Sequence, residues 1–134
     1  MVVLDPGDEA IAALSEFSRH EGLSAAQLTA SGAVESAAVG CSDRRRQQYR
    51  RIAVDEQCEV LSLAGDVALG AAAAELHVHA VLGLSDGSTR GGHLLDGRVW
   101  PTLEVIIRES PAELRKTYRP DVGLALIDLS ASQG

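Results

Sequence analysis

The chain has 134 residues, 46% of them hydrophobic, and its formal net charge is −7 with an isoelectric point near 5.0. This length predicts one domain, residues 1–134, and no apolar run approaches the roughly 20 residues that a membrane span needs. An acidic chain repels phosphate backbones at long range, which disfavours direct binding of nucleic acid.

The N-terminal region predicts a short strand followed by the main helix. Residues 2–4 are apolar and suit a strand. Asp5 is a good helix cap with Pro6 in the first helical position, and small and apolar residues then recur at helical spacing up to Gly22. We therefore predict a helix over about residues 6–21. His20, in its last turn, is expected to be a surface residue near the terminal carbonyl groups.

The remaining chain predicts strands and turns. Apolar alternation and short apolar runs predict strands over residues 36–42, 51–54, 58–65 (with an extension to 69), 75–83, 102–108 and 123–129. We expect residues 70–74 to form a loop, because five residues are too few for an independent helix, and we expect Gly97 and Pro101 to interrupt their region. The result is an α+β fold, a compact and mostly antiparallel sheet with one principal N-terminal helix.

The two cysteines indicate the compartment. Cys41 and Cys58 are widely spaced and match neither a zinc knuckle nor a redox motif. The N-terminus lacks the charged region and cleavage site of a secretory signal. Because thiols stay reduced in the cytoplasm, we expect a cytoplasmic protein.

Two histidines alternate along the strand predicted at 75–83. Residues i and i+2 of a strand project to the same side, so His77 and His79 share one face. Leu76 and Val78 point to the other face, toward a core. Two imidazoles buried without partners would cost stability, so we expect something to occupy this face. A metal ion is the first candidate.

A third histidine, His93, follows in a Gly-Gly-His-Leu segment, and turn geometry decides whether it joins the pair. A two-residue loop at Asp86-Gly87 would place His93 opposite Ala80, on the core side. A three-residue loop, Ser85 to Gly87, would place it opposite His79 instead. A bulge at the two glycines would also correct the two-residue case. The sequence alone leaves these alternatives open.

Three imidazoles with an open fourth position describe a zinc site that keeps a water molecule or a ligand. Glu104 or water would complete the coordination, and a bound zinc or other divalent ion would polarise a carbonyl group or activate water. Arg98 and Glu104 are the candidates for binding ligand, by charge stabilisation and proton transfer. The alternative is that the three histidines only form hydrogen bonds within a polar contact between subunits.

A basic stretch at residues 43–51 offers a different function. Arg44, Arg45 and Arg46 are consecutive in it, and they are the candidates for contacts with nucleic acid. The other interpretation is a solvated hairpin loop, because runs of charge usually cover surface.

The ordered set of motifs resembles the plants-and-prokaryotes conserved (PPC) domain over nearly the whole chain, from about Val3 to Leu129. The stretches that carry the resemblance are Leu4-Asp5-Pro6-Gly7-Asp8, Ser31-Gly32-Ala33-Val34, Glu59-Val60-Leu61-Ser62-Leu63-Ala64-Gly65, Leu76-His77-Val78-His79-Ala80, Gly91-Gly92-His93-Leu94 and Thr102-Leu103-Glu104-Val105.

The resemblance implies a homotrimer with a fold similar to acetolactate decarboxylase, whose zinc is held by three histidines. Carried over here, the metal ligands would be His77, His79 and His93. The family stretch that matters for association in plant members matches residues 59–63. The chain has no AT-hook, because the glycine and proline of that motif do not accompany its arginines. We therefore expect a trimeric metal-binding domain with a small-molecule ligand, with a DNA-associated or regulatory module of this family as the alternative.

Overall fold

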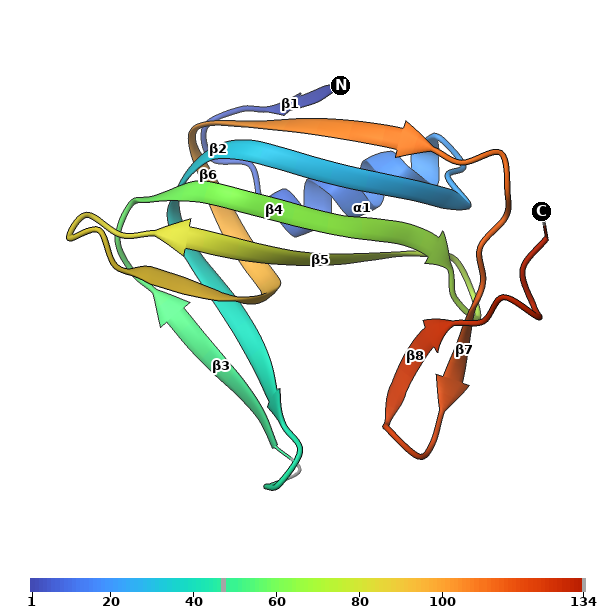
Figure 1. Ribbon diagram of the computed structural model, residues 1–134. Coiled ribbons are helices and arrows are strands. Elements are labelled where there is room, and N and C mark those ends of the chain that lie inside the picture. The colour runs from blue at the N-terminus through green and yellow to red at the C-terminus, as the bar shows by residue number, and fades with distance from the viewer. Residues whose placement is uncertain (47, 134) are drawn as a thin grey trace.

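The computed structural model describes residues 1–46 and 48–133 and has the predicted α+β architecture, a mostly antiparallel sheet with one principal helix (Figure 1). Gln47, in the arginine-rich turn, and Gly134 lie outside the described residues. In chain order the elements are β1 (Val2–Leu4), α1 (Ala10–His20), β2 (Ala25–Asp43), β3 (Gln48–Val54), β4 (Cys58–Leu69), β5 (Ala74–Gly83), β6 (Thr89–Glu109), β7 (Lys116–Arg119) and β8 (Leu124–Ile127).

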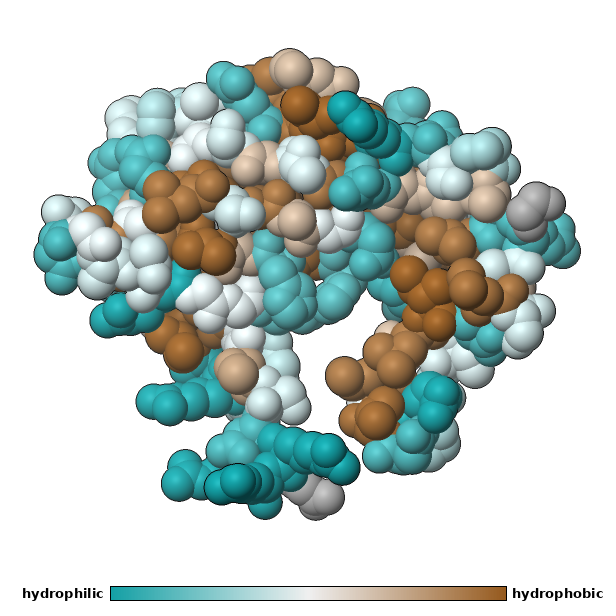
Figure 2. All heavy atoms as spheres, in the orientation of Figure 1, coloured by the Kyte–Doolittle hydropathy of each residue, from teal (hydrophilic) through white to brown (hydrophobic). Residues whose placement is uncertain are grey.

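Six strands form the main sheet in the order β1-β6-β5-β4-β2-β3. The long strand β6 also pairs with β2, so that the sheet closes on itself. Strands β7 and β8 form a separate two-stranded hairpin. In Figure 1 this hairpin and the arm made by β3 and the end of β2 project from the same side of the main sheet, and Figure 2 shows the surface hollowed between them.

The helix begins later than the sequence predicts. The Asp5–Pro6 pair lies in a turn before the helix, which starts at Ala10 with Glu9 as its N-cap. The Glu9 carboxylate accepts two backbone N–H groups of the first turn, at 3.3 and 2.7 Å, and also the Gly97 N–H of β6 at 2.9 Å. The hydrogen bond from Gly97, a residue distant in the chain, favours Glu9 as the N-cap of the helix. Within the described residues, no helix has both the length and the apolar character that a membrane span requires.

Strand β6 is continuous through Pro101, where the sequence predicts an interruption. Its register against β2 moves from Gly32 opposite Leu103 to Val34 opposite Val99, so three residues of β6 lie across from one of β2. Proline cannot donate a ladder hydrogen bond, and a bulge is the place in a sheet where it needs none. The long strands β2 and β6 therefore bend without ending.

The helix covers one face of the sheet, where the alternation in β5 buries Val78, Ala80 and Leu82. Leu14 of α1 is fully buried in the same cluster. The opposite face of β5 carries the histidines. The sequence therefore separates an apolar core on the helix side from a polar face on the other side, as the alternation predicts.

Candidate metal centre

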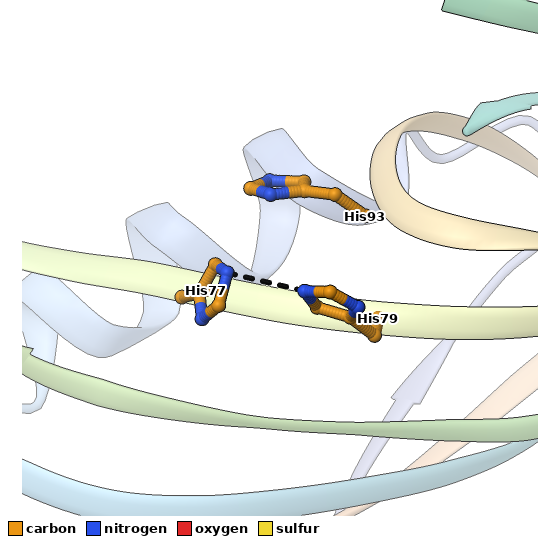
Figure 3. A group of neighbouring side chains, drawn as sticks. All are labelled: His77, His79 and His93. Atoms are coloured by element: carbon orange, nitrogen blue, oxygen red, sulfur yellow. Dashed lines mark hydrogen bonds between the residues drawn. The ribbon is translucent and has the colours of Figure 1, made fainter. Parts of the chain in front are cut away.

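The three histidines meet on the face of the sheet that points away from α1. His77 and His79 project from β5 and His93 from β6 (Figure 3). His79 and His93 are direct partners in the antiparallel register of β5 and β6. The rings of His77 and His93 have centroids 4.9 Å apart, and those of His77 and His79 are 5.0 Å apart.

A three-residue turn produces this register. The Leu84 N–H donates to the Ser88 carbonyl at 2.8 Å, and the Gly87 N–H donates back to the Leu84 carbonyl at 2.9 Å. Gly87 has φ +83°, the left-handed conformation that this loop requires. Of the alternatives left open by the sequence, the structure has the three-residue loop, and this choice brings His93 to the face of the other two histidines.

Beside His93 the chain passes very close to a neighbouring strand. A side-chain carbon at Gly92 would collide with the Gly40 carbonyl oxygen of β2. The ring of Tyr49, on β3, lies over Gly40 and stands edge-on to His93 with centroids 6.5 Å apart. The two glycines therefore give β6 and β2 the close approach that sets His93 beside this tyrosine.

The spacing of the imidazole nitrogens fits one metal ion. The Nε2 atoms of His77 and His79 lie 3.3 Å apart, the contact drawn in Figure 3. Two nitrogens bound to zinc at ordinary lengths and a tetrahedral angle would be about 3.3–3.4 Å apart. The candidate ligand atoms of all three histidines lie within 4.8 Å of one another, so the donor set is able to hold a metal ion.

The environment also favours the protonation state that binds metal. Burial lowers the pKa of His93, and the nearby His77, His79 and Lys116 lower it further. A lowered pKa favours the neutral form of this imidazole, and only a neutral imidazole offers a lone pair to a cation.

Two charged residues that the sequence analysis did not single out adjoin the cluster. Asp66, on β4, lies directly opposite His77 in the register of β4 and β5, with its Oδ2 atom 3.6 Å from the His77 Nδ1 atom. The Lys116 ammonium lies 3.1 Å from the Asp66 Oδ1 atom. The residue of β4 that lies opposite His77 depends on the length of the loop between β4 and β5, which the sequence pattern does not determine. The sign of Asp66 in the sequence was a charged residue within a predicted strand.

The structure does not bring Arg98 and Glu104 into the histidine cluster. Arg98 pairs with the Glu35 carboxylate at 2.7 Å. Glu104 lies opposite Ser31, nine positions along β2 from Gly40, the partner of His93. At about 3.3 Å per residue this separation is far beyond the reach of a shared ligand. The expected roles of Arg98 and Glu104 at the metal therefore have no geometric support in this chain.

The three consecutive arginines lie at the tip of the arm formed by β2 and β3, away from the core, and all three are exposed. The Asp43 carboxylate faces this turn: it accepts the backbone N–H groups of Arg45 and Arg46 and lies 3.8 Å from the Arg46 guanidinium. Part of the positive charge at the tip is therefore neutralised locally.

Two solved structures of similar length resemble the chain closely. One is a protein from Archaeoglobus fulgidus described as metal-containing, with 31% identity, a TM-score of 0.85, and coverage of 95% of this chain and 90% of that one. Another, from Bacteroides thetaiotaomicron, is described as a candidate DNA-binding protein, with 25% identity, a TM-score of 0.92, and coverage of 96% and 90%.

A more distant solved structure bears on the fold alone. A Staphylococcus aureus protein of unknown function, described as similar to alpha-acetolactate decarboxylase, has a TM-score of 0.53 at 14% identity and covers 81% of this chain and 51% of that one. This likeness agrees with the fold expected from the sequence. The curated Bifunctional protein GlmU of Synechococcus sp. (strain JA-3-3Ab) is 28% identical over 126 residues, which are 92% of this chain but only 19% of that protein's length.

The family model described as the Plants and Prokaryotes Conserved (PCC) domain matches residues 1–111. That range includes the helix, the six strands of the main sheet and all three histidines of the cluster. The chain therefore belongs to the Plants and Prokaryotes Conserved domain family, the one whose motifs the sequence resembles.

Proposed function

We propose that this protein holds one divalent metal ion, zinc in the first instance, at His77, His79 and His93, and that it binds a small-molecule ligand at the open coordination position. The observation that carries the proposal is the convergence of three imidazoles from two strands, with two Nε2 atoms at the spacing of zinc ligands. The metal-containing relative from Archaeoglobus fulgidus supports it.

The donor set itself argues for zinc or a similar ion. Neutral imidazole suits zinc and other late transition metals, whereas magnesium and calcium prefer oxygen ligands. When bound, such an ion would supply a Lewis acid for a carbonyl group or for water. The three histidines would leave one side of the ion for a ligand, and His79 is exposed at that side of the sheet.

Elemental analysis of untagged protein, purified without chelators, tests the metal. We expect about one ion per chain, and we expect His77→Ala and His93→Ala to lose it. His20→Ala is the matched control, because His20 is exposed at the end of α1 and belongs to no cluster of metal-ligating residues that the structure describes. Protein that contains no metal either as purified or after incubation with zinc would refute the proposal.

A ligand assay tests the second half of the proposal. Zinc-loaded protein should bind members of a library of small carbonyl and carboxylate compounds, and the binding should disappear with chelator and return with zinc. If one ion binds per chain but no compound binds, the metal has only a structural role.

We also propose that the protein is a homotrimer. Large apolar side chains stay exposed on the surface of the described chain: Leu61 of β4 is 60% exposed, Val81 of β5 is 42% exposed, and Leu124 of β8 is 54% exposed. Hydrophobic spheres gather along the hairpin of β7 and β8 in Figure 2. Exposed apolar patches of this kind mark surfaces of association. Leu61 also lies in the stretch 59–63, which the family resemblance links to association.

Light scattering at micromolar concentration tests the assembly. We expect the mass of three chains for the native protein and a smaller mass for Leu61→Lys, which places a charge in the contact. Glu16→Lys, at an exposed position of α1 outside the stretch 59–63, controls for added charge alone. A native protein that is monomeric at this concentration would contradict the trimer.

A DNA-associated role is the second candidate function. Its specific support is the exposed Arg44, Arg45 and Arg46 at the arm tip, together with the relative described as a candidate DNA-binding protein. The net charge of −7 opposes it. A gel-shift assay at physiological salt should show binding that is lost when all three arginines become glutamine. A shift that survives this replacement would refute the arginine contact, and no shift would refute the role.

A further inference from the structure

The geometry points to Asp66 as a positioning residue for the metal ligand His77, with Lys116 holding the Asp66 carboxylate in place. This inference rests on the metal binding proposed above. It assigns a role to two residues outside the three histidines, one of which, Lys116, lies beyond residues 1–111 that the family model matches.

The two nitrogens of His77 face different partners. Its Nε2 atom faces the His79 Nε2 atom at 3.3 Å, on the side where the metal would bind. Its Nδ1 atom faces the Asp66 Oδ2 atom at 3.6 Å. A carboxylate on the far nitrogen selects the tautomer with hydrogen on Nδ1, which leaves the Nε2 lone pair free for the ion. At 3.6 Å the two atoms form a close electrostatic contact that is longer than a hydrogen bond.

The Asp66 carboxylate is itself held by a lysine from another part of the fold. The Lys116 side chain is only 7% exposed, and its Nζ atom lies 3.1 Å from the buried Asp66 Oδ1 atom. The contact between Lys116 and Asp66 is an ion pair. Lys116 reaches this position because the Leu69 N–H at the end of β4 donates to the Leu114 carbonyl at 2.8 Å.

The arrangement places one negative charge between two positive ones. With metal bound, the His77 imidazole carries part of the charge of the ion, and Lys116 is a full cation on the other side of Asp66. A carboxylate in that position would make the imidazole a stronger ligand and would screen the metal from the lysine. Loss of such an outer partner typically weakens metal binding by about 10–100-fold.

A simpler role for Asp66 would be to neutralise the buried Lys116, and the two roles differ in a measurable way. Removing Asp66 alone leaves a buried ammonium without its partner and lowers stability under either role. Removing Asp66 and Lys116 together eliminates both charges. If Asp66 serves only the lysine, the double variant Asp66→Ala/Lys116→Met will bind metal like the native protein.

The experiment measures zinc affinity by competition with a chromophoric chelator, alongside the unfolding temperature of each metal-free variant. We expect a 10–100-fold loss for Asp66→Ala and a loss of the same order for the folded double variant. Asp66→Asn keeps an acceptor oxygen and should bind more tightly than Asp66→Ala. Glu59→Ala, which removes an exposed carboxylate from the same strand, should stay within about twofold of the native protein.

Nitrogen NMR of the zinc-loaded protein gives a second readout that stability does not affect. His77 should show a proton on Nδ1 in the native protein, and its resonance should shift in Asp66→Ala. Native-like affinity and an unchanged His77 signal in the folded double variant would overturn the inference. A native protein that binds no zinc would instead refute the proposed function, so the two failures are distinguishable.

Discussion

His79 and His93 face each other directly across the antiparallel pair of β5 and β6, and their ring centroids are 5.6 Å apart. His77 joins them from two positions along the same face of β5. The site therefore depends on one hairpin, and the three-residue turn that ends at Gly87 determines which face His93 takes. We therefore expect substitutions that destabilise the hairpin of β5 and β6 to weaken metal binding as well.

Alanine substitutions at two glycines should distinguish the cost of a strained backbone conformation from the cost of a steric collision between strands. Gly87→Ala meets no atom nearby but must hold φ +83°, so we expect a loss of about 1 kcal/mol in the free energy of unfolding with metal binding retained. Gly92→Ala would press against the Gly40 backbone of β2, so we expect a larger loss and weaker zinc binding. Urea unfolding and chelator competition measure both effects. A Gly92→Ala variant with native zinc affinity would contradict the role of the close approach.

Truncation to alanine should cost much more stability at one residue of β5 than at its neighbour in the chain. Leu82 is fully buried against the helix side of the sheet, and Leu82→Ala should cost about 2–5 kcal/mol. Val81 points to the other face, and in the unassembled chain Val81→Ala should change stability by less than about 0.5 kcal/mol. Chemical denaturation at low protein concentration measures both values. Equal losses would show that the alternation of faces is not as described.

Zinc should stabilise the folded chain against heat. A ligand that binds only the native state adds about 2.7 kcal/mol when its free concentration is 100 times its dissociation constant. We therefore expect the unfolding temperature to rise on addition of zinc and to fall again with excess chelator. The variant His93→Ala should show neither change. A zinc-dependent rise of native size in His93→Ala would place the ion elsewhere.

The turn that positions His93 should make a contribution to stability that depends on pH. Asp86 accepts hydrogen bonds from the Ser88 hydroxyl and backbone N–H, and these bonds hold the pKa of Asp86 below its ordinary value of 3.8. Because the folded-state pKa is lowered, this contribution to stability is present above pH 3.8 and is lost as the pH falls through the folded-state pKa.

Ser88→Ala removes the hydroxyl donor, so the pKa of Asp86 should rise toward its ordinary value while the backbone donor keeps part of the shift. Carbon NMR of the carboxyl group across an acid titration measures this change. Asp128, whose pKa is lowered by a similar bond from the Ser130 hydroxyl, is the internal control and should not move. An unchanged pKa at Asp86 would mean that the turn is held differently.

The sequence by itself predicted the features that local chemistry decides. A period of two in residues 76–82 separates the histidine face from the apolar face, because successive side chains of a strand point in opposite directions. The α+β class follows from one helical stripe among many short apolar runs. The set of His77, His79 and His93 was reached from spacing together with the family resemblance, although spacing alone left the face of His93 open.

Only the tertiary structure decided what depends on distant segments meeting. The helix starts at Ala10 because Glu9 also binds the Gly97 N–H of β6, and β6 passes through Pro101 because a bulge against β2 accommodates it. Strand pairing likewise separates Glu104 from the histidines and brings Asp66 opposite His77. These outcomes depend on loop lengths, register shifts and close backbone contacts, whose free energies come from interactions between distant parts of the chain and are not contained in the pattern of any one segment.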